Sequence, residues 1–251
     1  MSAPVLLVIA HGSRDPRHAA TVHALVRRAR SLRPGLRVET AFLDFNLPAV
    51  PGVLDRLAAD GVRDVVALPL LLTRAFHAKA DIPAVLRQAP PGLRIRQAEV
   101  LGPSPLLVSA VEQRLYEAGL TPGDKSATGV VLASAGSTDP EAIAAIAETA
   151  RELRRTGWCS VRPAFASASL PRTADAVRAL RADGVRRVAV APYVIAPGRL
   201  PDRIAAGAAD GGADVLADVL GPSPELARLL IERYEECRAR RAENLAARAA
   251  G

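Results

Sequence analysis

Aromatic residues and cysteines are scarce in this 251-residue sequence. Aromatic side chains make up 3% of it, and the two cysteines, Cys159 and Cys237, form neither a CxxC motif nor the Cys/His spacing of a zinc site. A core poor in aromatics must be built from Val, Leu, Ile and Ala, which suits parallel strands buried on both faces. Isolated cysteines favour a reducing compartment, so we expect a cytoplasmic protein without disulfides.

Long hydrophobic runs are also missing. The N-terminal run Val5–Ala10 is too short for a signal peptide, and no basic segment precedes it. The longest apolar stretch, residues 65–72, is far below the roughly 20 residues that cross a bilayer. We therefore expect no export and no membrane partner.

The sequence is basic, with 33 Lys and Arg against 26 Asp and Glu, a formal charge of +7 and a pI near 10.3. This excess reflects either an Arg-rich composition alone or attraction for a polyanion. Nucleic acid is a poor candidate, because the basic residues are scattered, aromatics for base stacking are few, and no recognition module is present. A small polycarboxylate ligand fits better.

Four segments recur in order along the chain. HGSRDP at residues 11–16 is matched by AGSTDP at 135–140, and VETAFLDFNLP at 38–48 by VRPAFASASLP at 161–171. DGVR at 60–63 recurs at 183–186, and VLGPSP at 100–105 recurs unchanged at 219–224. This internal repeat indicates gene duplication and fusion. It predicts domains at residues 1–120 and 129–251, joined by a short polar linker at 121–128.

Each half alternates short apolar runs with helical stretches of a dozen or more residues. In the first half we expect strands near residues 5–10, 36–43, 64–70 and 93–100. Asp-Pro and Ser-Pro pairs mark helix starts, because Asp or Ser can cap and Pro suits the first helical position. The pattern predicts two tandem, duplicated four-stranded parallel-sheet α/β domains, flavodoxin-like in outline, with strand order 2-1-3-4.

Three polar side chains follow strands of the first half. His11 comes directly after strand one, Asp44 after strand two, and His77 in the loop after strand three. Ligands bind at the carboxyl ends of such strands. Strands one and three are expected to be neighbours, so His11 and His77 should face each other across one crevice. Two imidazoles and a carboxylate suit Fe²⁺, Co²⁺ or Ni²⁺.

The second half has lost these groups. His11 aligns with Ala135 and Asp44 with Ser167, and the segment 196–200 contains no histidine. The Gly, Ser, Asp and Pro of the repeat are kept in both halves. Shared residues are therefore expected to be structural, and residues confined to one half are candidates for chemistry.

The HGSR motif after the first strand and the segment LLL…HAKADIP at residues 70–83 closely resemble the class II chelatases that metallate sirohydrochlorin. The resemblance covers essentially the whole chain, in the fused long form of the family. It implies that His11 and His77 are the catalytic, metal-binding pair, and that Asp44 helps hold the metal, as in some relatives. The His-rich or cysteine-cluster tails of some long forms are absent, so we expect no iron–sulfur cluster.

The resemblance implies a mechanism and a substrate. Neutral imidazoles would hold the ion over the ring and then accept two pyrrole protons. The ion, Co²⁺ or Fe²⁺ and less readily Ni²⁺, is a substrate, and no permanent cofactor is expected. The tetrapyrrole carries eight carboxylates. The groups expected to bind it are Gly12, Ser13, Arg14, Arg74, Lys79, Arg199 and Arg203.

Fusion also suggests an assembly. A single-copy chelatase would form a homodimer in which each subunit provides one side of a cleft. Here the second half of the same chain is expected to provide the second side. Arg199 and Arg203 should then lie opposite the N-terminal histidines, and a monomer is expected.

Other interpretations stay open. A carrier of tetrapyrrole or metal would keep the histidines without turnover, and a histidine phosphatase usually has Arg where Ala10 stands. The metal is undecided between Co²⁺, toward cobalamin, and Fe²⁺, toward siroheme. Asp44 could cap a turn, and Asp81 is interpreted as a helix start like Asp202. His18 and His23 are expected on a solvent-facing helix surface, and Phe42, Trp158 and Phe165 in the core.

Overall fold

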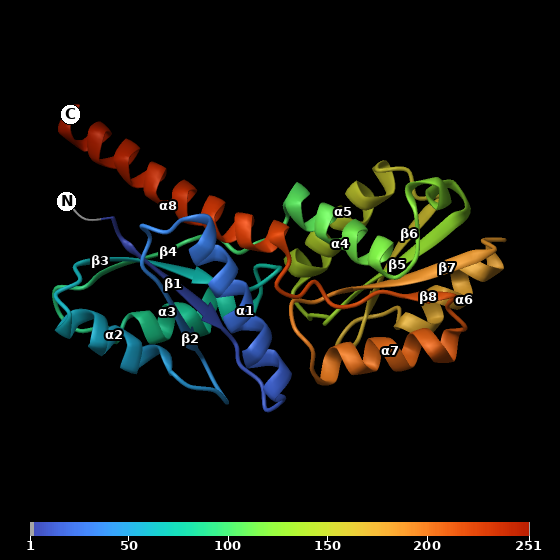
Figure 1. Ribbon diagram of the computed structural model, residues 1–251, viewed down its shortest axis with the longest axis horizontal. Helices are drawn as coiled ribbons and strands as arrows, with labels where there is room; N and C mark the ends of the chain where they lie inside the picture. Colours follow the sequence, from blue (N-terminus) through green and yellow to red (C-terminus); the bar gives the residue numbers. More distant parts are fainter. Residues whose placement is uncertain (1–2, 251) are drawn as a thin grey trace. The chain divides into compact units, whose positions relative to one another are not determined.

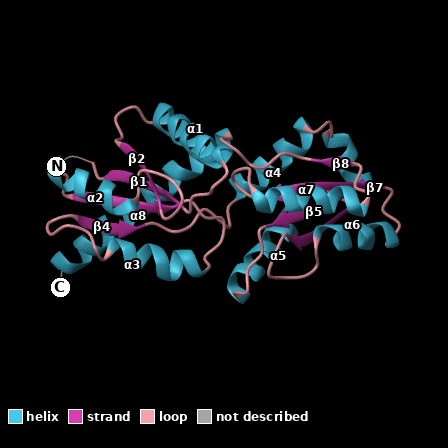
Figure 2. Ribbon diagram, turned by 90° about the horizontal axis from the view of Figure 1, so that it is seen from below, coloured by secondary structure: helices cyan, strands magenta, loops and turns pink. Residues whose placement is uncertain are grey.

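The computed structural model describes the backbone of residues 3–250 and the side chains of residues 3–240. It contains two four-stranded parallel sheets, with strand orders β2-β1-β3-β4 and β6-β5-β7-β8. Helices lie on both faces of each sheet (Figure 2). The predicted α/β class, the duplication and the strand order are confirmed.

The elements follow the expected alternation of strand and helix. The strands are β1 Val5–Ala10, β2 Val38–Phe42, β3 Asp64–Pro69, β4 Arg94–Gln97, β5 Thr128–Ser134, β6 Ser160–Phe165, β7 Arg187–Tyr193 and β8 Val215–Leu216. The helices are α1 Pro16–Leu32, α2 Val50–Ala59, α3 Ile82–Leu86, α4 Pro105–Glu117, α5 Pro140–Arg155, α6 Thr173–Ala182, α7 Arg199–Gly211 and α8 Pro224–Ala250. Two short helices complete the set, the π-helix η1 His77–Asp81 and the 3₁₀ helix η2 Pro122–Ala127.

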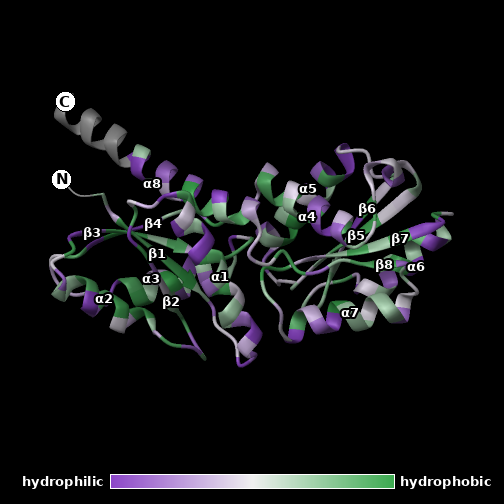
Figure 3. Cartoon of the chain, in the orientation of Figure 1, coloured by the Kyte–Doolittle hydropathy of each residue, from purple (hydrophilic) through white to green (hydrophobic). Residues whose placement is uncertain are grey.

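The core of each unit is aliphatic, as the composition predicts. Every residue of β1 is buried, because a central parallel strand is covered on both faces. One side of the first sheet packs on α2 and Ile82. Phe42, Trp158 and Phe165 are also buried, as expected. Hydrophobic colours accordingly follow the inner strands, and hydrophilic colours follow the outer sides of the helices (Figure 3).

The helix starts use the predicted caps. The Asp15 carboxylate accepts a hydrogen bond from the Arg17 amide at 2.9 Å, and Asp139 accepts one from the Glu141 amide at 3.0 Å. Ser104 does the same for Leu106. None of the helices in the described part of the chain has the length and apolar character that a membrane span requires.

The compact units of the structure differ from the two halves of the sequence repeat, residues 1–120 and 129–251. One compact unit joins the chain up to Leu101 with the chain from Ala227 onward, and the other is Gly102–Leu226. Helix α4 therefore belongs with β5–β8, and most of α8 belongs with β1–β4 (Figure 1). The expected linker is an ordered 3₁₀ helix with a capping box between Thr121 and Asp124.

Specific contacts hold α8 in the first unit. The Tyr234 hydroxyl donates to the Pro4 carbonyl at 2.6 Å, and the Arg233 guanidinium donates to the carbonyls of Val100 and Leu101. The last helices of the two halves are thus exchanged. Because both follow the same VLGPSP segment, the sequence repeat cannot tell which of two similar sheets each helix covers.

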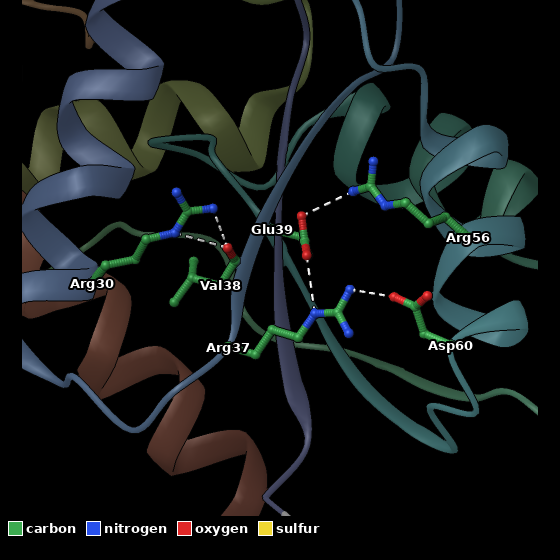
Figure 4. Close-up of polar contacts among 6 residues, drawn as sticks. All are labelled: Arg30, Arg37, Val38, Glu39, Arg56 and Asp60. Carbon is green, nitrogen blue, oxygen red and sulfur yellow. Dashed lines mark hydrogen bonds and ion pairs between the residues drawn. The ribbon is translucent and has the colours of Figure 1, made fainter.

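Charged groups lie along the edge strand β2 (Figure 4). Glu39 lies between two guanidinium groups, with Arg37 at 3.0 Å and Arg56 of α2 at 2.9 Å, and Arg37 also contacts Asp60 at 2.7 Å. Arg30 of α1 donates to the Val38 carbonyl at 3.0 Å. An edge strand protected in this way is a poor template for pairing with another chain.

A glycine at a positive φ lets the loops after the first two strands of each unit touch. A Cβ at Gly12, which has a φ of 98°, would lie 1.8 Å from the Asp44 carbonyl oxygen. Its repeat partner Gly136, with a φ of 96°, would place a Cβ 1.9 Å from the Ser167 carbonyl oxygen. The glycine that both halves share is therefore structural.

We expect Gly12→Ala and Gly136→Ala each to lower the free energy of unfolding by more than about 3 kcal/mol, because a backbone atom blocks the new methyl group. Gly61→Ala is the matched control. Its φ is also positive, at 75°, but no atom beyond its chain neighbours lies within 4 Å of the place that a Cβ would take, so it should cost only about 1–2 kcal/mol. Urea unfolding followed by circular dichroism measures all three. Equal losses at Gly12 and Gly61 would refute the contact argument.

Candidate functional site

His11 and His77 lie side by side at the carboxyl ends of β1 and β3. Their ring centroids are 4.4 Å apart, and the ring planes meet at 69°. The pairing of β1 with β3, in which Ile9 lies opposite Pro69, places the two following loops next to each other. The predicted meeting of the two histidines is confirmed. Both residues are half-buried, so the pair is reachable from solvent.

Asp81 orients one member of this pair. Its Oδ2 lies 2.5 Å from His77 Nδ1, one helical turn away along η1. A carboxylate at this distance accepts the Nδ1 proton, which leaves Nε2 as the unprotonated nitrogen that can bind a metal. Helix α3 does begin at Ile82, directly after Asp81, as expected, but Asp81 is itself helical because η1 precedes it, and its side chain makes no cap bond. The four-residue spacing on a helix was the signal for this contact.

Asp44 is exposed, and its carboxylate accepts a hydrogen bond from the next amide, that of Phe45, at 2.8 Å. The Asp44 amide donates to the His11 carbonyl at 2.9 Å, which ties the two loops together. Within the part of the chain that the structure describes, no three His, Cys, Asp or Glu side chains are grouped to hold a metal ion. The expected set of two imidazoles and a carboxylate is therefore not assembled here.

His18 and His23 do not face solvent as expected, and both are half-buried. His23 packs against Phe42, with ring centroids 5.7 Å apart. His18 Nδ1 is buried and has no hydrogen-bond partner among the described residues. Burial lowers the pKa of His18, and its electrostatic interaction with His11 lowers it further. His18 is thus a third imidazole in the electrostatic neighbourhood of the pair.

Arg74 and Lys79 line one cavity of about 300 Å³ in the first unit. Its walls come from the loop after β3, from η1 and α3, and from the chain just after β4, which contributes Glu99. The side-chain amide of Gln97 donates to the Ala78 carbonyl across this wall at 2.9 Å. Neither His11 nor His77 lines the cavity. Two of the predicted carboxylate-binding cations therefore share a pocket separate from the histidine pair.

The other predicted binding residues are placed differently. The Ser13 amide donates to the Asn46 side chain at 2.7 Å, and the Ser13 hydroxyl accepts from the Asp15 amide. Arg14 is exposed, and its guanidinium carbon lies 5.1 Å from the centre of the Phe45 ring. Arg199 and Arg203 are exposed on the first turns of α7 in the second unit.

The second unit keeps the same loops without the chemistry. Ala135 replaces His11, and the Ser167 hydroxyl, in the place of Asp44, donates to the Ala135 carbonyl at 2.8 Å. Gly198 stands four residues before Asp202, where the first unit has His77 before Asp81. Two imidazoles suit a first-row divalent metal, because their nitrogens are ligands of intermediate softness. Only the first unit offers such a pair, since all four histidines of the sequence lie in its first half.

The chain is similar to known proteins over most of its length. A family model described as CbiX matches residues 5–118 and again residues 129–237. A sirohydrochlorin cobaltochelatase of Priestia megaterium is 28% identical over 244 residues, which covers 92% of this chain and 79% of that protein. A sirohydrochlorin ferrochelatase of the same organism is 25% identical over 233 residues, covering 90% and 87%.

Solved structures share the fold. A structure described as SirB from Bacillus subtilis with Fe3+ superposes with a TM-score of 0.81 at 24% identity, covering 94% of this chain and 95% of that one. A structure of CbiX, described as the terminal enzyme for biosynthesis of siroheme in denitrifying bacteria, gives 0.71 at 22% identity, covering 92% and 98%. Both likenesses extend over the two units.

We expect Asp81→Asn to weaken Co²⁺ binding by the histidine pair about tenfold, because carboxylate partners of ligating histidines typically contribute 10–100-fold in affinity. Asp202→Asn is the matched control, since its helix carries Gly198 in place of the histidine. Calorimetric titration with Co²⁺ measures both, and Asp81→Glu should restore part of the loss. Equal affinities for the two Asn variants would show that Asp81 does not orient His77.

Proposed function

The chain belongs to the CbiX family, and we propose that it is a sirohydrochlorin chelatase, a lyase-class enzyme that inserts Co²⁺ or Fe²⁺ into sirohydrochlorin. The observation that carries this proposal is the His11–His77 pair, 4.4 Å apart at the strand ends of one unit and missing from the other. Relatives with cobaltochelatase and ferrochelatase names both support it. A Co²⁺ enzyme would serve cobalamin synthesis, and an Fe²⁺ enzyme siroheme synthesis.

Metal insertion requires the histidine pair to bind the ion and to accept protons. A hydrated divalent ion must first be stripped of water, and neutral imidazole nitrogens can replace part of its hydration shell. Two pyrrole protons must then leave as the ion enters the ring. The same nitrogens become free at that moment and can accept them. The hydrogen bond from His77 Nδ1 to Asp81 suits this second step, because a carboxylate stabilises the imidazolium that forms.

The metal is a substrate in this scheme, and no permanent cofactor takes part. Asp44 is proposed as an auxiliary ligand that would have to turn toward the pair, since its carboxylate now bonds to the Phe45 amide. Ni²⁺ is a weaker candidate than Co²⁺ or Fe²⁺. The site is mononuclear in this proposal, with its remaining coordination positions taken by water or by the ring nitrogens.

The carboxylates of the tetrapyrrole need cations. The cavity beside η1 offers Arg74 and Lys79, and its volume of about 300 Å³ accommodates one or two carboxylate arms. Arg14 offers a third cation near the pair. Gly12, Ser13, Arg199 and Arg203 stay predictions, because the described contacts of Gly12 and Ser13 are structural and the other two lie on α7.

A cytoplasmic monomer remains our proposal for the working state. A carrier that binds the same ligands without turnover is the alternative. The imidazole pair favours an enzyme, because proton acceptance is needed for insertion and not for carriage. Light scattering over a concentration series tests the monomer, and an obligate dimer whose activity falls on dilution would contradict it.

His11→Ala and His77→Ala should each reduce the metallation rate at least about a hundredfold, since each removes a ligand and a proton acceptor from the transition state. Anaerobic incubation with sirohydrochlorin and Co²⁺ or Fe²⁺, followed by visible absorption, gives the rate. Activity retained in a folded variant of either residue would remove the pair from the mechanism.

Asp44→Ala should raise the Co²⁺ concentration needed for half-maximal rate, by a smaller factor than either histidine variant. Ser167→Ala is its matched control in the second unit, where it should affect only stability through the lost bond to the Ala135 carbonyl. An unchanged metal dependence in Asp44→Ala would leave Asp44 a purely structural residue.

Arg74→Gln and Lys79→Gln should each raise the KM for the tetrapyrrole about tenfold, with little change in kcat, because each removes a charge-assisted hydrogen bond to a carboxylate. The effect should shrink as salt is added. Arg87→Gln, an exposed site outside the cavity, is the control. Unchanged KM values at low salt would show that the cavity does not receive the substrate.

A further inference from the structure

Two exposed phenylalanines flank the histidine pair. Phe45 is 49% exposed and Phe76 is 66% exposed, although the whole chain has four phenylalanines. The Phe45 ring centre lies 6.2 Å from that of His11, and the Phe76 ring centre lies 6.2 Å from that of His77. Two of the four phenylalanines are thus solvent-exposed and lie next to the two histidines, in a protein with few aromatic residues.

The position of Phe45 is costly for a large side chain. Its φ is 60°, in the left-handed region that bulky residues avoid at about 1–2 kcal/mol. Ala168 has the same conformation in the second unit, with a φ of 59°. The fold therefore needs the backbone turn in both units, and the turn does not need an aromatic ring. Strained residues of this kind concentrate at functional sites.

Both rings are confined to the unit that has the histidines. Phe45 corresponds to Ala168, and Phe76, five residues before Asp81, corresponds to Pro197, five residues before Asp202. By contrast Leu47, which is 82% exposed on the same loop as Phe45, keeps an exposed counterpart in Leu170. Phe45 and Phe76, like the two histidines, are present in the first unit and absent from the second. Leu47, like the structural residues of the repeat, is present in both units.

Arg14 adds a cation to this surface. Its guanidinium carbon is 5.1 Å from the Phe45 ring centre, a cation–π distance. An aromatic ring beside a guanidinium matches a ligand that has an apolar, flat body and anionic groups at its rim. A second copy of this chain, which is basic, would meet like charge at the same place.

We propose that Phe45 and Phe76 form a stacking platform, defined by these two rings, for the conjugated macrocycle of the tetrapyrrole. This rests on the proposed chelatase function and names the part of the site that holds the ring itself. The platform contacts the macrocycle next to the two imidazoles, so that the ion held by the pair lies beside the pyrrole nitrogens. Arg14 then reaches a carboxylate at the rim of the ring.

The test is binding of metal-free sirohydrochlorin, followed by its visible absorption, to Phe45→Ala, Phe76→Ala and the double variant. Phe45→Ala copies the residue that the second unit carries at the same φ, so it should fold normally. Each single change should raise the Kd about tenfold, and the double change more, since each removes one aromatic face on which the ring can stack. Co²⁺ affinity of the histidine pair should stay unchanged.

Two controls sharpen the result. Phe45→Tyr keeps the ring and should bind like the wild type. Leu47→Ala removes a more exposed apolar side chain of the same loop that has no ring, and it should leave the Kd unchanged. An unchanged Kd in the double variant, with a wild type that binds, would overturn the platform and leave the chelatase proposal intact. So would a double variant that loses only self-association in sedimentation. A wild type that does not bind the tetrapyrrole would overturn both.

Discussion

The parallel pairing of β1 with β3 is the constraint on which the site depends. Parallel neighbours end at the same edge of a sheet, so the residues that follow them meet whatever their distance in sequence. His11 and His77 are 66 positions apart, and this pairing brings their rings to 4.4 Å. The Gly12 contact with the Asp44 carbonyl then fixes the loop after β1, and the bond to Asp81 fixes His77 from its own helix.

Duplication separates what the fold needs from what the chemistry needs. The second unit repeats the strand order, the glycine at positive φ and the left-handed residue after its second strand. It repeats neither histidine, nor Asp44, nor the two exposed phenylalanines. A backbone maintained without these side chains cannot require them for stability. Their presence in the first unit alone is what we would expect if they serve the metal and tetrapyrrole binding proposed above.

Much of this could be predicted from the sequence, because its strongest signals are local or periodic. Apolar runs predict the strands, Asp-Pro and Ser-Pro pairs predict helix starts, and the repeat predicts two similar sheets. The exchange of α4 and α8 was not predictable, because each helix is preceded by the same segment and could cover either sheet. The contact of Asp81 with His77 was not predicted, because an aspartate before Ile-Pro already fits a helix start and only the geometry of η1 shows the second role. The exposure of Phe45 and Phe76 depends on loop conformation, which composition does not reveal.

The measurement that tests the central claim most directly is metallation of sirohydrochlorin by the wild-type protein. Purified protein is incubated anaerobically with the tetrapyrrole and Co²⁺, Fe²⁺ or Ni²⁺ in turn, and the visible absorption of the ring is followed against a protein-free reaction. The account predicts catalytic turnover with Co²⁺ or Fe²⁺, well above the uncatalysed rate and over many cycles per chain. Tight binding of the tetrapyrrole without faster metal insertion by any of the three ions would contradict it, and would make the protein a carrier.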